Sequence, residues 1–162
     1  MELRPMHNER DPVRAREAFI FQEAILFLGL ARLMTAAMKF SWFSRMLGKQ
    51  VSCEPKVPGK AQLERAQEVA FAVAQMSRRV PWKARCLVRA IAAQLMLGRR
   101  RINSTLYLGV SRSNDKPLKA HAWVKCGDAF LTGERPAMDY TVVARFSNEF
   151  YGNRRIVGED AG

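Results

Sequence analysis

The sequence predicts an α+β domain in which the helices come first and an antiparallel sheet follows. Up to Leu97 apolar residues recur every three or four positions, the spacing of one face of a helix. From Leu106 onward the spacing changes to two, which is typical of strands. Helices that precede the strands, instead of alternating with them, indicate an α+β fold.

The first predicted helix begins at Asp11-Pro12, where Asp is a favoured N-cap and Pro a favoured first helical residue. It is expected to run to about Met38, and residues 1–15 are expected to be disordered or weakly ordered. A short helix over 41–47 follows. Residues 49–60 contain two prolines and a glycine, and we expect a linker there.

Two more helices are predicted over 60–79 and 82–97. The residue before Pro81 disfavours helix, so the two are expected to be separate. The second is apolar on most of its surface, which predicts a central, buried helix.

The second half of the chain is expected to form strands. Alternating apolar residues predict strands over 105–110 and 119–126. Gly127-Asp128 predicts a tight turn into a strand over 129–132, and hence a hairpin. Residues 140–146 fit either a further strand or a short helix.

The length of 162 residues suits one domain with an appended helical segment. We divide the chain into an N-terminal helical region with its linker (1–58), a core (59–150) and a flexible tail (151–162). Three cysteines without a C-x-x-C pair argue against a disulfide framework and fit the reducing cytoplasm.

The net charge of +12 predicts attraction to anionic partners. Arg99, Arg100 and Arg101 cluster at a helix end without interleaved aromatic residues, so a nucleic-acid partner is not expected. The apolar run 18–38 is interrupted by polar and charged residues, so we expect a buried or partner-facing helix and no membrane association.

Cys86 and His121 are the candidate catalytic residues. A thiol near a helix N-terminus lies at the positive end of the helix dipole, which favours a thiolate nucleophile. His121, one of two histidines, lies in the second predicted strand on the same face as Trp123, in a sheet that we expect to pack on the Cys86 helix. A structural role also accounts for both residues: Cys86 would be a small core residue and His121 an ordinary histidine in a strand.

A third group is usually needed to orient the imidazole. If Gly127 and Asp128 form a two-residue turn, Glu134 falls opposite His121 on the same sheet face. Glu134 is therefore the register-based candidate, and an ordinary surface carboxylate explains it equally well. We expect Asp128 to be solvated at the turn, and Asp139 is an alternative if the chain folds back. Because the cysteines lack the paired spacings of a zinc site, we expect no metal and no cofactor.

Four segments of this sequence resemble the transglutaminase-like leader peptidases of lasso-peptide biosynthesis. They are PWxxxCLVRA (81–90), LxLGRR (95–100), LYLGV (106–110) and KAHAWV (119–124). The segment 23–32 also looks like the helical region that precedes the protease domain there, so that the resemblance spans roughly residues 18–135.

The resemblance implies a papain-like cysteine protease core, with Cys86 as nucleophile and His121 as base. It implies removal of the leader from a ribosomally made precursor peptide, together with a small leader-recognition protein and a macrolactam-forming cyclase. The family usually has an aspartate where this chain has about Gly133, followed by Glu134. This departure keeps open a weakly active or non-catalytic scaffold that binds a peptide or protein partner.

Overall fold

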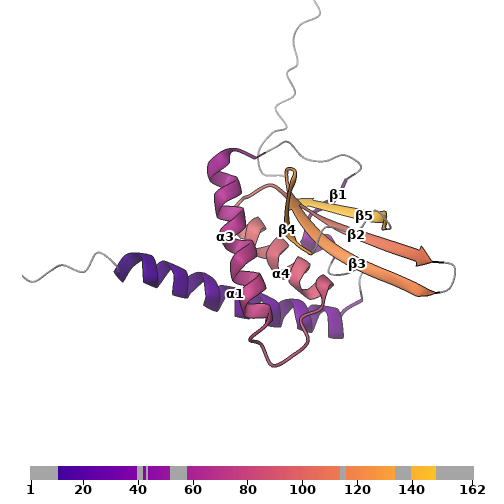
Figure 1. Cartoon of the computed structure of the whole chain (residues 1–162), viewed down its shortest axis with the longest axis horizontal. Helices are drawn as coiled ribbons and strands as arrows, with labels where there is room; N and C mark the ends of the chain where they lie inside the picture. Colours follow the sequence, from indigo (N-terminus) through magenta and orange to yellow (C-terminus); the bar gives the residue numbers. More distant parts are fainter. Residues whose placement is uncertain are drawn as a thin grey trace, which may run out of the picture.

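The computed structural model describes residues 11–39, 42, 44–51, 58–113, 116–133 and 140–148. Over these ranges, three α-helices pack with a five-stranded antiparallel sheet (Figure 1). The prediction of an α+β fold is confirmed. The predictions for Glu134, Asp139 and the tail concern residues outside these ranges.

The long N-terminal helix is α1, Asp11–Ala37, and its predicted extent is confirmed. Of the predicted short helix over 41–47, Trp42 is helical and Ser44–Leu47 form a 3₁₀ turn, η1. Helix α3 is Lys60–Ser77 and helix α4 is Cys86–Arg99.

Helix α4 begins four residues later than predicted, at Cys86. The preceding residue, Arg85, has an extended backbone with φ −64° and ψ 166°. The Trp82 ring lies against α1, since a Cβ built on Gly29 would be 3.8 Å from the ring. This contact with another helix takes the segment before Cys86 out of the helix, and no local propensity would reveal it.

The sheet has the strand order β1-β5-β2-β3-β4, and its neighbouring strands are antiparallel. Its strands are β1 (Lys49–Gln50), β2 (Ser104–Ser113), β3 (Lys116–Cys126), β4 (Ala129–Thr132) and β5 (Thr141–Asn148). The predicted hairpin turn is confirmed, because Cys126 pairs with Ala129. Residues 141–148 form a strand, and the expected linker contributes the short strand β1.

The core lies between α4 and one face of the sheet, and α1 and α3 pack against α4 (Figure 1). Eight of the fourteen residues of α4 are buried, which confirms the prediction of a central helix. The strands contribute apolar side chains that include Leu106, Ala122, Val124, Cys126 and Phe146.

Helix α1 has one buried and one exposed apolar side. Ala24, Leu28, Ala31 and Met34 lie in the common core. On the other side Phe19, Leu26 and Leu33 are each more than half exposed. The segment Ala18–Ala37 is long and apolar enough to cross a membrane by length and composition.

Candidate active site

Cys86 is the first residue of α4 and is half-buried. The first hydrogen bond of the helix runs from the Arg89 N–H to the Arg85 carbonyl oxygen, at 3.1 Å. The backbone N–H groups from Cys86 to Val88 therefore have no acceptor within the helix, and they form the positive end of its dipole. Cys86 is a free cysteine. The predicted location of the thiol at a helix start is confirmed.

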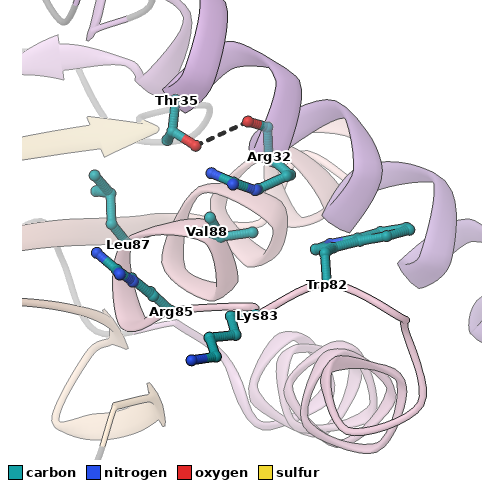
Figure 2. Close-up of a pocket in the computed structure, with 7 residues that line it drawn as sticks. All are labelled: Arg32, Thr35, Trp82, Lys83, Arg85, Leu87 and Val88. Atoms are coloured by element: carbon teal, nitrogen blue, oxygen red, sulfur yellow. Dashed lines mark hydrogen bonds between the residues drawn. The ribbon is translucent and has the colours of Figure 1, made fainter.

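A pocket of about 560 Å³ lies beside the start of α4 (Figure 2). Arg85 and Leu87, the two sequence neighbours of Cys86, both line it. The other described lining residues come from α1 and from the segment that leads into α4: Arg32, Thr35, Trp82, Lys83 and Val88. Figure 2 shows Arg32 extending from α1 on one side of Val88 and Arg85 on the other.

His121 lies in β3, opposite Gly109 of β2. Its ring centroid is 5.9 Å from that of Trp123 and 5.4 Å from that of Tyr140. A Cβ built on Gly133 would lie 3.2 Å from its Nε2. The imidazole therefore lies among aromatic rings beside the end of the β3–β4 hairpin.

The face of β3 that packs against α4 is not the face that carries His121. Ala122, Val124 and Cys126 belong to the core cluster with the helices. Successive side chains of a strand point to opposite faces, so His121 and Trp123 project away from α4. Trp123 is buried on that other face, where its ring stacks 5.5 Å from Tyr107. The sheet does pack on the Cys86 helix as expected, but the expectation that the His121 face meets that helix is wrong.

The prediction for Glu134 assumed an unbroken register along the hairpin of β3 and β4, which the structure does not show. An irregularity between Val124 and Lys125 shifts the pairing, so that Lys125 pairs with Phe130 while Val124 pairs with Thr132. Glu134 itself lies outside the described residues. Asp128 is exposed at the turn, as expected.

Cys126 differs from Cys86 in its surroundings. It is 1% exposed, and its thiol donates a hydrogen bond to the Asn103 carbonyl oxygen at 3.2 Å. Burial raises the pKa of the Cys126 thiol from 9.0 to about 11. This thiol is therefore neutral and structural. Within the described ranges no three His, Cys, Asp or Glu side chains are grouped to hold a metal ion.

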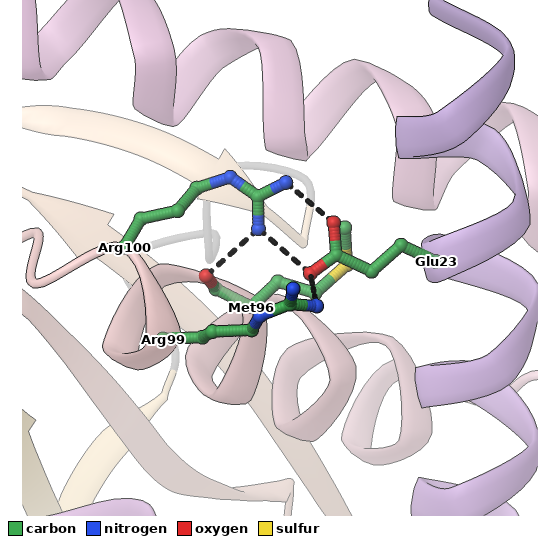
Figure 3. A network of polar contacts seen from close by, with 4 residues as sticks. All are labelled: Glu23, Met96, Arg99 and Arg100. Carbon is green, nitrogen blue, oxygen red and sulfur yellow. Dashed lines mark hydrogen bonds and ion pairs between the residues drawn. The ribbon is translucent and has the colours of Figure 1, made fainter. Parts of the chain in front are cut away.

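The far end of α4 is held to α1 by a buried carboxylate (Figure 3). The Glu23 side chain is 3% exposed and accepts hydrogen bonds from Arg99 at 2.9 Å and from both terminal nitrogens of Arg100. Arg100 also donates to the Met96 carbonyl oxygen. Two arginines that the sequence suggested as anion-binding groups therefore pair within the protein.

The pocket residues Arg32, Trp82 and Lys83 were not identified as site residues from the sequence. Arg32 lies on α1, far from Cys86 along the chain, and only the packing of α1 against α4 brings it to the pocket. PWxxxC was noted as a segment of resemblance, and this segment supplies the Trp82 and Lys83 side chains.

Comparison with protein-family models matches residues 30–145 to the transglutaminase-like superfamily. No curated protein and no solved structure matches the chain in the corresponding searches. The family match covers more than two thirds of the 162 residues and includes both Cys86 and His121. It agrees with the observed fold, in which a cysteine-bearing helix packs on an antiparallel sheet. The chain belongs to the transglutaminase-like superfamily.

Proposed function

We propose that this protein is a cytoplasmic thiol peptidase that removes the leader from a ribosomally made precursor peptide. The observation that carries the proposal is the half-buried, free Cys86 at the N-terminus of the central helix of a transglutaminase-like domain. The four segments of resemblance to leader peptidases support the precursor peptide as substrate.

In the proposed reaction the Cys86 thiolate attacks the carbonyl carbon of the scissile amide, and the C–N bond breaks as the amine takes a proton. Water then hydrolyses the thioester and releases the leader as a carboxylate. The unpaired N–H groups of the first turn of α4 are the nearest donors to the oxygen that becomes negative. A small leader-recognition protein and a macrolactam-forming cyclase are the proposed partners.

His121 is the base that the resemblance implies. For it to exchange a proton with Cys86, its imidazole must leave Trp123 and Tyr140 or reach around the strand. Proton transfer needs heavy atoms within about 3 Å, directly or through one water. The role of His121 therefore needs a test separate from that of Cys86.

The test is cleavage of a candidate precursor peptide, taken from a short reading frame found beside the gene and assayed with the proposed partner proteins, followed by mass spectrometry. Wild-type protein should release the leader, and Cys86→Ala should release none. Cys126→Ala is the matched control, since that thiol is buried in the core. Full cleavage by Cys86→Ala would refute the peptidase proposal. His121→Gln should slow cleavage by at least about a hundredfold if the imidazole is the base.

The second candidate function is a non-catalytic scaffold that binds a peptide or protein partner. Two observations favour it: His121 projects away from α4, and α1 has an exposed apolar side with Phe19, Leu26 and Leu33. The reaction of Cys86 with iodoacetamide near neutral pH separates the two functions. A peptidase thiol should react faster than glutathione under the same conditions, whereas a scaffold thiol should react no faster.

A further inference from the structure

The pocket beside the start of α4 has a strongly positive lining. Arg32, Lys83 and Arg85 contribute three cations, and none of the described lining residues is acidic. Arg32 and Arg85 come from different segments, so this concentration of charge depends on the packing of α1 beside the start of α4 (Figure 2). Like charges brought together repel, and an anion between them removes that cost.

A polar group without a partner lies in the same lining. The Trp82 indole nitrogen is buried and has no hydrogen-bond partner among the described residues. A buried N–H that lacks an acceptor costs roughly 1–3 kcal/mol. The Thr35 hydroxyl, by contrast, is engaged with the Arg32 carbonyl oxygen at 3.0 Å. This nitrogen is itself closed off from solvent, so the three cations are the groups that the pocket presents to an acceptor-rich ligand.

The pocket also lies close to Cys86 along the chain. Arg85 and Leu87 line it, and Cys86 is between them in the chain. An extended peptide advances by roughly 3.5 Å per residue, so the side chain within one or two residues of the bond attacked by Cys86 comes to this pocket.

We propose that this pocket binds a carboxylate of the peptide substrate, the side chain of an Asp or Glu within about two residues of the scissile bond. Arginine pairs with carboxylates through two parallel N–H···O bonds, which gives direction as well as attraction. The pocket then selects acidic residues and places the neighbouring amide at the sulfur. This inference rests on the proposed peptidase function and adds its substrate preference.

The binding test uses full-length Cys86→Ala protein and two acetylated hexapeptide probes, one with three Glu residues and one with Gln in their place. Affinity is measured calorimetrically at about 0.15 M salt, where exposed charges are screened beyond roughly 8 Å. The Glu probe should bind at least about tenfold more tightly than the Gln probe, because hydrogen bonds to charged groups contribute roughly 1.5–3 kcal/mol.

The matched control separates the pocket from the general positive charge of the protein. The pocket variant is Arg32→Gln/Lys83→Gln/Arg85→Gln, and the control variant Lys49→Gln/Lys60→Gln/Arg65→Gln removes the same charge from exposed positions on β1 and α3. The pocket variant should lose at least about tenfold in affinity for the Glu probe and the control less than about threefold. Equal losses in the two variants, with both melting like the parent, would overturn the inference. Inorganic phosphate that binds as tightly as the Glu probe would overturn the carboxylate assignment.

A cleavage experiment distinguishes the failure of this inference from that of the proposed function. With Cys86 intact, Glu→Gln changes in the precursor near the cut should lower kcat/KM in wild type and have little effect in the pocket variant. Cleavage that is indifferent to those changes would refute the acidic preference and leave the peptidase intact. Selective binding of the Glu probe without any cleavage of the precursor would refute the peptidase function. The proposal that the pocket binds carboxylates would then still stand.

Discussion

Gln94 provides the sharpest test of how the sheet positions the cysteine-bearing helix. Its side chain is completely buried in α4. The Nε2 donates to the backbone oxygens of Leu47 at 3.0 Å, Phe146 at 3.1 Å and Ser104 at 3.3 Å. The Ser104 hydroxyl donates to Oε1 at 3.0 Å. One amide therefore joins α4 to η1, β2 and β5.

The change to test is Gln94→Met, which keeps the length of the side chain and removes all four contacts. Each net hydrogen bond contributes about 1 kcal/mol, and acceptors left buried without a donor add to the loss. The expected decrease in the free energy of unfolding is about 4 kcal/mol. This is a large part of the roughly 5–15 kcal/mol that stabilises a typical domain.

Urea unfolding measures the effect. With a slope of about 2 kcal/mol/M, the midpoint should fall by about 2 M. Gln67→Met on the exposed side of α3 is the control and should change stability by less than about 0.5 kcal/mol. A loss below about 1 kcal/mol in Gln94→Met would refute the argument that this amide fastens α4 to the sheet.

Three further changes test other parts of the structure. Glu23→Gln keeps a hydrogen-bond acceptor but removes the buried charge between α1 and α4. It should lower the free energy of unfolding by about 1–2 kcal/mol, since Arg100 retains partial access to water. An unchanged urea midpoint would contradict this. Because the Cys126 pKa is raised from 9.0 to about 11, the unfolded chain loses this proton first, and stability should fall by about 2 kcal/mol as pH rises from 9 to 11. Cys126→Ala should not show this loss of stability with rising pH. Identical pH profiles of stability for the two proteins would contradict the assignment of the loss to the Cys126 thiol. Gly133→Ala should lower the free energy of unfolding by about 1–3 kcal/mol and with it the melting temperature. Gly133 has φ +81°, and an added Cβ would lie 2.8 Å from the Trp123 Cβ. An unchanged melting temperature would contradict this.

Most of the fold was predictable because each element carries its own period. The apolar spacing of α1, α3 and α4 and the alternation in β2 and β3 are local signals, and these elements occur close to where they were expected. The beginning of α4 was not predictable. Trp82 and Lys83 are compatible with a helix, and the packing of Trp82 beside Gly29 decides otherwise.

The site was predictable only in part. The sequence located Cys86 near the start of a helix, although the predicted helix began four residues before it. Whether His121 faces α4 depends on which of the two alternating sets of β3 side chains packs on that helix. Ala122 and Val124 belong to the set that does. The bulge opposite Val124 has no marker such as a glycine within β4, so the register of the hairpin could not be derived.

The most direct test of the central claim is to look for a covalent intermediate on Cys86. Wild-type protein is mixed with the precursor peptide and its neighbouring proteins, quenched in acid during turnover, and analysed by intact and tandem mass spectrometry. The proposed mechanism predicts an increase equal to the leader acyl group, located on Cys86 and absent from Cys86→Ala. Leader release at the wild-type rate by Cys86→Ala, without an adduct on any cysteine, would contradict it.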